Sequence, residues 1–273
     1  MKIGVLQMTS GIDPAVNARA MTDAIAVAAH AGASMIFTPE MSGLLDRDRR
    51  RAAGSIVDET EDRVLAAVCD AAAAHRIWVH LGSLALHGED GRWVNRGFVI
   101  DDTGAIRARY DKLHLFDVDL PGGESWRESV AYTAGAATQV VDTPVGALGL
   151  SICYDLRFAA LYAALSTAGA SVLAIPAAFT QPTGAAHWHV MVRARAIESA
   201  SYVVAAAQSG VHDDGRTTFG HSLVVDPWGD VLLDMGVEPG LGFADLDPAR
   251  TADVRARIPV VAHRREIPAV TRS

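Results

Sequence analysis

The chain has 273 residues, half of them hydrophobic and 21% charged, and its formal net charge is −8. These proportions exclude a disordered chain, and the length suits one large α/β domain, which we expect to span residues 1–273. The acidic balance and the lack of a Lys- and Arg-rich stripe argue against nucleic acid as a partner.

Membrane attachment and export are not expected either. No uninterrupted apolar stretch approaches the roughly 18 residues that a membrane span needs, and no signal peptide is visible. The two cysteines, Cys69 and Cys153, are too few to suggest a disulfide framework. We therefore expect no membrane partner and a cytoplasmic location.

Strands alternate with helices along the first half of the chain. Residues 2–8 form an apolar strand, and Asp13-Pro14 supplies an N-cap and a first helical residue for an Ala-rich helix that ends near Gly32. The next expected elements are strand 34–37, a solvated basic loop at 47–51, helix 60–75, and strands 77–84, 92–100 and 105–110 with a turn at 102–104. This alternation indicates an α/β layered fold.

The second half of the chain echoes the first. Three pairs of segments match in the same order: 32–39 with 169–176, 91–104 with 215–229 (with one residue inserted), and 5–8 with 149–152. This order predicts two similar halves, joined by residues 111–140, although chance repetition of an α/β pattern is the alternative. Equivalent strands would then run side by side, and their C-terminal ends would converge on one crevice, where ligands bind in open α/β sheets.

Cys153 is the strongest candidate nucleophile. It follows the apolar strand 146–152 and precedes a helix that we expect to begin at Tyr154. Free N–H groups and the dipole at a helix start favour a thiolate and can bind an oxyanion. The alternative is a buried structural cysteine, and packing is the better interpretation for Cys69 on its Ala-rich helix.

Three charged residues could act with this thiol. Glu40 ends an apolar strand, where partial desolvation would raise its proton affinity and make it a usable base, unless it is only a capping or surface acid. Lys112 lies among aromatic and apolar residues and could hold an oxyanion, unless it pairs with a neighbouring aspartate. Glu128, in a loop-like stretch, resembles an ordinary surface acid on its own.

Metal and cofactor motifs are missing from the sequence. His187 and His189 are two residues apart on a predicted helix and therefore point to different faces. HExxH, paired CxxC, GxSxG and complete glycine-rich nucleotide motifs are absent. We expect neither a metal nor an organic cofactor.

The sequence resembles the nitrilase superfamily of carbon–nitrogen hydrolases over nearly its whole length. The resemblance rests on residues 39–41, 110–117, 153–158 and 221–229, in the family order. It implies an α-β-β-α sandwich of two pseudo-symmetric halves, usually dimerised so that four layers form, and hence a homodimer. It also implies a Glu-Lys-Cys triad, which is matched by Glu40, Lys112 and Cys153, and a second family glutamate that is matched by Glu128.

One departure from the family pattern follows the cysteine. Ala159-Ala160 stand where the family usually has Pro-Glu, which bears on the shape of the pocket or on dimer packing. The closer resemblance is to the branch that holds omega-amidases and deaminated glutathione amidases. Residues 183–188 and 193–198 fit both, whereas 203–210, His212 and 219–222 favour the second.

The resemblance predicts an amidohydrolase that uses a cysteine thioester and needs only a small-molecule amide as partner. Deaminated glutathione would give 2-oxoglutarate and cysteinylglycine; the alternative is an omega-amidase that acts on 2-oxoglutaramate or a related dicarboxylic monoamide. Glu40 would be the general base, while Lys112 and the backbone N–H of Tyr154 would hold the oxyanion.

Substrate contacts and two rival interpretations complete the expectations. Phe179 and Thr183, in the loop after residue 176, are candidate substrate-binding residues, unless they only pack the loop. One rival is a Cys–His hydrolase with His114 or His187 as base. The other is a catalytically silent dimeric binding module.

Overall fold

The computed structural model describes residues 1–120, 123 and 125–272. The strands of the two main sheets are β1 (Lys2–Gln7), β2 (Met35–Phe37), β3 (Trp78–His87), β4 (Trp93–Ile100), β5 (Ile106–Asp111), β8 (Val140–Thr143), β9 (Gly146–Leu150), β10 (Val172–Ala174), β11 (Tyr202–Ala205), β14 (Leu223–Val225), β15 (Val231–Asp234) and β16 (Gly240–Asp245). The hairpin strands are β6 (Asp117–Asp119), β7 (Ser125–Arg127), β12 (Ser209–Val211) and β13 (Thr217–Phe219).

The helices are α1 (Pro14–His30), α2 (Arg49–Ala52), α3 (Arg63–His75), α4 (Ala159–Thr167), α5 (Gln181–Ser199) and α6 (Pro248–Arg257). Three 3₁₀ segments are η1 (Glu59–Glu61), η2 (Glu128–Val130) and η3 (Cys153–Arg157). No helix in the described part of the chain has the length and apolar character to cross a membrane.

Two six-stranded sheets form the framework, and they have the same strand pattern. Their orders are β16-β1-β2-β3-β4-β5 and β8-β9-β10-β11-β14-β15. In each sheet three successive central strands are parallel and the flanking strands are antiparallel. The predicted two similar halves are therefore present in the topology.

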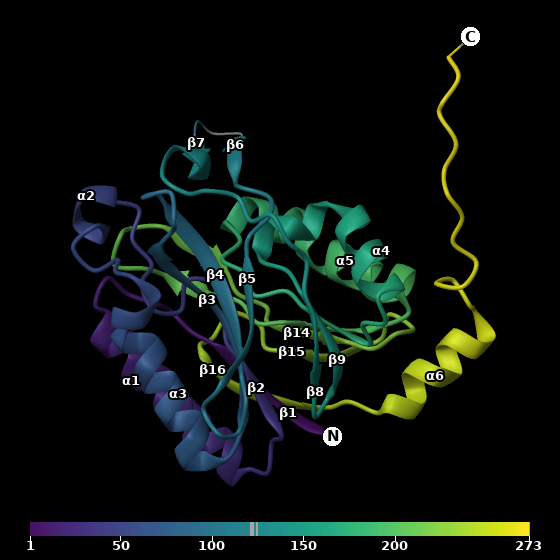
Figure 1. The fold of residues 1–273 in the computed structure, drawn as a ribbon, viewed down its shortest axis with the longest axis horizontal. Coiled ribbons are helices and arrows are strands. Elements are labelled where there is room, and N and C mark those ends of the chain that lie inside the picture. Colours follow the sequence, from purple (N-terminus) through teal and green to yellow (C-terminus); the bar gives the residue numbers. More distant parts are fainter. Residues whose placement is uncertain (121–122, 124, 273) are drawn as a thin grey trace.

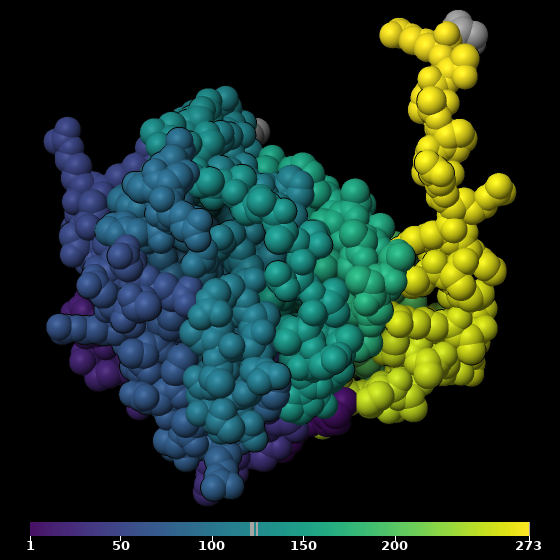
Figure 2. Space-filling view, in the orientation of Figure 1, coloured from purple at the N-terminus to yellow at the C-terminus, as the bar shows by residue number. Residues whose placement is uncertain are grey.

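The sheets pack face to face between two helical layers. Ile3 and Val5 of β1 belong to the same buried cluster as Leu148 and Leu150 of β9, so this cluster fills the space between the sheets. Helices α1 and α3 cover the outer face of the first sheet, and α4 and α5 cover the second (Figure 1). The predicted α-β-β-α sandwich is confirmed. Figure 2 shows the C-terminal segment after α6 extending away from this body.

The repeated turns confirm one predicted correspondence in detail. Asp101 Oδ1 accepts hydrogen bonds from the N–H groups of Thr103 and Ala105 between β4 and β5. Asp226 Oδ1 accepts the equivalent pair from Trp228 and Asp230 between β14 and β15. An aspartate that accepts hydrogen bonds from the backbone N–H groups two and four residues later stabilises a turn through local contacts. Such a turn can therefore be predicted from the sequence.

Two features of the predicted symmetry are corrected. Equivalent strands lie in facing sheets and not side by side in one sheet. The β1–β2 and β9–β10 registers also pair Val5 with Phe37 and Leu150 with Ala174, so Val5 corresponds to Leu150 and not to Gly149. A slip of one residue exchanges the two faces of a strand. A Cβ on Gly149 would meet the Leu165 side chain of α4, whereas Leu150 faces the core between the sheets.

Two local predictions also change. The 47–51 segment is not simply a loop, because Arg49–Ala52 forms a single helical turn capped by Asp48. The residues after Cys153 form the 3₁₀ segment η3, and the α-helix begins only at Ala159. Its N-cap, Phe158, makes no side-chain cap hydrogen bond.

Candidate active site

One cavity of about 700 Å³ collects residues from distant parts of the chain. All seven residues predicted from sequence line it: Glu40, Lys112, Glu128, Cys153, Tyr154, Phe179 and Thr183. Glu40 follows β2, Lys112 follows β5 and Cys153 follows β9, so the cavity lies where strand ends of both sheets meet. Neither His114 nor His187 lines it.

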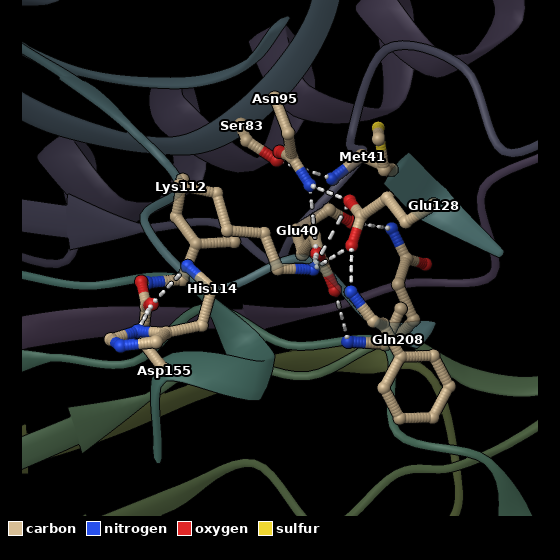
Figure 3. Close-up of polar contacts among 12 residues, drawn as sticks. Glu40, Met41, Ser83, Asn95, Lys112, His114, Glu128, Asp155 and Gln208 are labelled. Atoms are coloured by element: carbon tan, nitrogen blue, oxygen red, sulfur yellow. Dashed lines mark hydrogen bonds and ion pairs between the residues drawn. The ribbon is translucent and has the colours of Figure 1, made fainter. Parts of the chain in front are cut away.

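Lys112 lies between two carboxylates at the floor of the cavity. Its ammonium is 2.9 Å from Glu40 Oε1 and 2.9 Å from Glu128 Oε2, and the Lys112 residue is only 3% exposed (Figure 3). Burial by itself lowers the pKa of Lys112, but Glu128 and Glu40 more than offset this effect and raise the pKa well above its usual value. Lys112 is therefore a permanently charged donor.

Glu40 is held by groups in segments that follow strands of both sheets. Its Oε1 accepts a hydrogen bond from Lys112, and its Oε2 accepts one from the backbone N–H of Ala178 at 3.0 Å. Gln208 Nε2 donates to the Glu40 carbonyl oxygen at 2.9 Å. Gly82 in β3 lets the segment from Thr38 to Glu40 pass close to this strand, because a Cβ on residue 82 would lie 2.2 Å from the carbonyl oxygen of Thr38.

Asn95 completes the carboxylate group and was missed by sequence reasoning. Its Nδ2 donates to Glu40 Oε1 at 2.9 Å and is 3.3 Å from Glu128 Oε1, so one amide bridges both acids. The only sequence signal is a buried-type position occupied by a neutral polar residue, next to Arg96, in the mainly apolar strand β4. Such a residue predicts a buried hydrogen bond, but not its partner.

Cys153 has an unusual backbone conformation and a buried side chain. Its φ angle is 49°, in the left-handed region, and its N–H donates to the Pro176 carbonyl at 2.9 Å. A non-glycine residue in this region carries strain that neighbouring contacts must hold, as often occurs at functional sites. The residue is 7% exposed.

The expected thiolate character of Cys153 is corrected. Burial raises the pKa of this thiol well above its usual value, and the negative charge of Glu40 raises it further. Lys112 and the N–H of Ala178 act in the opposite direction but do not prevail. The resting sulfur is a neutral thiol, so nucleophilic attack requires a base.

Asp155 ties the segment of Lys112 to the turn of Cys153, and it too was missed. Its buried carboxylate accepts hydrogen bonds from Tyr110 Oη at 2.7 Å and from the Ile152 N–H at 2.9 Å. It also accepts one from the His114 N–H and lies 2.6 Å from His114 Nδ1. Figure 3 shows His114 directed to Asp155 and away from Glu40.

The backbone at Tyr154 offers an anion-binding group. Among the described residues, the Tyr154 N–H has no hydrogen-bond acceptor, although the neighbouring N–H groups of Cys153 and Asp155 are paired. The donor expected at this position is therefore available, but in a 3₁₀ turn and not at the start of an α-helix.

Arginines distinguish the mouth of the cavity. Arg157 lies 5.6 Å from the Phe179 ring centroid and 6.0 Å from that of Tyr154, and it has no carboxylate partner in the described part of the chain. Arg47, Arg49 and Arg50 of the basic cluster also line the cavity. The expectation that this cluster is merely solvated is corrected, since folding brings it to the entrance.

The chain is similar to known proteins over nearly its whole length. The family model described as carbon-nitrogen hydrolase matches residues 2–256. The nitrilase and fragile histidine triad fusion protein NitFhit of Caenorhabditis elegans is 40% identical over 269 residues, which cover 96% of this chain but only 60% of the fusion protein. The deaminated glutathione amidase of Synechocystis sp. (strain PCC 6803 / GT-S) is 40% identical over 265 residues, covering 95% of this chain and 96% of the relative.

Solved structures agree with these matches. The crystal structure of C. elegans NitFhit has a TM-score of 0.89 at 39% identity and covers 97% of this chain and 65% of its own. An amidase mutant from Nesterenkonia sp. AN1 has a TM-score of 0.81 at 26% identity, covering 97% of this chain and 94% of its own. That structure shows covalent addition of the acetamide moiety of fluoroacetamide at the active site cysteine.

Replacing Glu40 with Gln should make Cys153 more acidic, because it removes a charge that raises the pKa of the thiol. We expect the midpoint of thiolate formation to fall by about 1 pH unit or more. The measurement is the ultraviolet thiolate absorbance against pH, recorded with and without Glu40→Gln in a Cys69→Ser background. In each case the absorbance of the matching protein that also carries Cys153→Ala is subtracted, which isolates the signal of Cys153.

Two further variants test the same assignment, one with the opposite expected shift and one as a control. Lys112→Met should move the midpoint to higher pH, because Lys112 favours the thiolate. Glu89→Gln, which removes an exposed carboxylate outside the cavity, should leave the midpoint unchanged. A midpoint that rises in Glu40→Gln would contradict the assigned electrostatics.

Proposed function

Because the chain belongs to the carbon–nitrogen hydrolase family and is a hydrolase that acts on amides, we propose that it cleaves a linear carboxamide through a thioester on Cys153. The family resemblance and the amidase class expected from the sequence are confirmed by these matches. The observation that carries the proposal is the position of Glu40, Lys112 and Cys153 on one cavity, with Glu40 and Lys112 in direct contact.

In the first step Glu40 accepts the thiol proton as Cys153 Sγ attacks the substrate carbonyl carbon. The neutral resting thiol supports this order of events, because a base is then needed during attack. The carbonyl oxygen becomes an oxyanion, held by the Lys112 ammonium and the unpaired N–H of Tyr154.

In the second step the tetrahedral intermediate collapses. Glu40 returns the proton to the leaving nitrogen, the C–N bond breaks, and the acyl group stays on sulfur as a thioester. A water molecule then gives a proton to Glu40 and attacks the thioester, and the proton passes to the departing Cys153 sulfur. No metal or organic cofactor takes part in these steps.

Glu128 acts as a positioning residue in this scheme. Both of its carboxylate oxygens contact the Lys112 ammonium, at 3.2 and 2.9 Å, and Oε2 also accepts the N–H of Phe116 at 2.7 Å. These contacts fix the direction of the ammonium, which would otherwise rotate about a flexible side chain. The covalent adduct at the cysteine of the Nesterenkonia amidase supports a covalent route in a related protein.

The proposed substrate is deaminated glutathione, which yields 2-oxoglutarate and cysteinylglycine. Curated relatives that carry the name deaminated glutathione amidase support this choice. The cavity is large enough for a substrate of this size, and Phe179 and Thr183 on its wall remain the proposed substrate contacts. The alternative is an omega-amidase that acts on 2-oxoglutaramate or a related dicarboxylic monoamide.

Two separate arginines on the cavity wall favour the larger anion. Arg157, between the rings of Phe179 and Tyr154, suits the carboxylate of the 2-oxo acid portion. The Arg50 guanidinium at the entrance has no partner among the described residues and suits the distant glycine carboxylate. The smaller substrate, 2-oxoglutaramate, lacks this second carboxylate.

We also propose a homodimer in a reducing compartment such as the cytoplasm. Exposed apolar side chains gather where the C-terminal part of α5 meets the β14–β15 hairpin: Ile197, Trp228, Val231 and Leu232. A second copy of the chain would cover them. The proposed chemistry needs Cys153 as a free thiol, and both cysteines are unpaired.

Cys153→Ala should lower kcat for amide hydrolysis by roughly 10⁴-fold or more, because it removes the nucleophile. Cys69→Ala is the matched control and should retain activity, since Cys69 lies on α3 outside the cavity. His187→Ala should also retain most activity. Product release from the amide is measured with purified protein, and hydrolysis that survives Cys153→Ala would end the thioester proposal.

Arg50→Ala should lower kcat/KM for deaminated glutathione by about tenfold, the value of one charge-assisted hydrogen bond. The same variant should leave kcat/KM for 2-oxoglutaramate unchanged. Arg19→Ala, an exposed arginine of α1 outside the cavity, is the control. A higher kcat/KM for 2-oxoglutaramate than for deaminated glutathione in the unaltered protein would favour the omega-amidase.

Ile197→Glu should convert a dimer into a monomer, because a charge would be buried in the proposed interface. Size-exclusion chromatography with light scattering gives the molar mass. Val27→Glu, which alters an exposed apolar residue of α1, should leave the mass unchanged. A monomeric unaltered protein would refute the homodimer.

A further inference from the structure

Three potential metal ligands meet outside the cavity, on residues that the proposed reaction does not use. His189 lies on α5, His221 lies between β13 and β14, and Asp234 ends β15. One ligand atom from each lies within 4.8 Å of the other two. His189 Nε2 is 2.9 Å from Asp234 Oδ2, and His221 Nδ1 is 2.8 Å from Asp234 Oδ1.

The His221 side chain is held in place by its backbone and its neighbours. The backbone N–H of His221 donates to the Gly236 carbonyl at 2.6 Å, and the backbone carbonyl of His221 accepts a hydrogen bond from Trp188 Nε1 at 2.7 Å. Its φ angle is 55°, and its ring stacks on Phe219 with centroids 4.6 Å apart. A ligand fixed in this way loses little conformational entropy when it binds an ion.

Asp234 is also oriented for coordination. Its Oδ1 accepts the N–H of Gly236 at 2.9 Å, which supports the carboxylate from outside the group. The carboxylate can therefore act as an oriented anionic ligand.

Two imidazoles and a carboxylate form a donor set suited to borderline divalent metals, above all Zn²⁺. Tetrahedral zinc with bonds of about 2.0–2.1 Å separates its ligand atoms by roughly 3.3 Å. The N···O distances of 2.8 and 2.9 Å, which end on different oxygens of Asp234, would open by about half an ångström. The widest separation among the three ligand atoms, at most 4.8 Å, would close by up to about 1.5 Å through small side-chain rotations. The side chains are 24–38% exposed, which leaves the fourth position open to water.

We propose that His189, His221 and Asp234 form a Zn²⁺-binding site that is separate from the amide-hydrolysing cavity. The bound ion takes the place of the imidazole protons now shared with Asp234 and ties α5 to the β13–β15 region. Because the folded chain brings these ligands together and the unfolded chain does not, zinc stabilises the native state. The sequence-based expectation of no metal site considered His189 only with its neighbour His187.

The experiment uses the full chain with Cys153→Ala, so that the active-site thiol cannot bind the ion. Equilibrium dialysis against Zn²⁺ should give one ion per chain, and zinc should raise the Tm. Adding His221→Ala or His189→Ala should weaken binding by about 100-fold or more, since losing a ligand costs at least as much as losing its outer support. The zinc-dependent rise in Tm should disappear in the same variants.

The matched control is His87→Ala in the same background. His87 also pairs with an aspartate, Asp58 at 3.1 Å, but no third potential ligand joins this pair in the described part of the chain, so the change should leave zinc binding intact. Co²⁺ in place of zinc should give the visible absorption of a tetrahedral site without the ultraviolet band of a thiolate ligand. Circular dichroism without metal establishes that each variant folds.

Two results would overturn the proposal. One is a Cys153→Ala protein that binds no zinc at concentrations that saturate ordinary three-ligand protein sites. The other is zinc binding that persists undiminished in both folded histidine variants. Amide hydrolysis by the unaltered protein is a separate measurement, so failure of the zinc site and failure of the proposed reaction are distinguishable.

Discussion

The arrangement of the cavity depends on one buried ammonium group, that of Lys112. Removing a charge from water is costly unless opposite charges and hydrogen bonds replace the lost solvation, and Lys112 obtains these from Glu40 and Glu128. Of these charged groups, Glu40 and Lys112 act on Cys153 in opposite directions. Burial, together with the negative charge of Glu40, raises the pKa of the Cys153 thiol and keeps the sulfur protonated at rest, so the proposed reaction needs Glu40 as a proton acceptor.

The two halves of the fold supply opposite sides of this group. Glu40, Asn95 and Lys112 come from the first sheet or the segments that follow its strands, whereas Cys153 and Ala178 follow strands of the second. Asp155 joins the sides, because its carboxylate binds Tyr110 near Lys112 and Ile152 next to Cys153. A shift between the sheets would therefore change the distance between Lys112 and Cys153.

At the cavity entrance and in the His189–His221–Asp234 group, folding brings together residues that indicate no function separately. Arg50 is a surface arginine on a single helical turn, and only its position at the cavity mouth suggests a substrate carboxylate. The three proposed zinc ligands are ordinary polar residues on three separate segments. Each gains a chemical interpretation only from its neighbours in space.

The sequence by itself determined the layered α/β class, the two similar halves and the turns at Asp101 and Asp226, and with the family resemblance it identified seven residues that line the cavity. These features arise from local physics or from motifs: hydrophobic periodicity, capping, turn chemistry, and polar residues at the ends of apolar strands. Only the tertiary structure decided the register between the halves, the neutral state of Cys153, the bridging role of Asn95 and the clamp at Asp155. Those depend on distances between segments far apart in the chain and on burial, and neither quantity is encoded in the spacing of residues along one strand or helix.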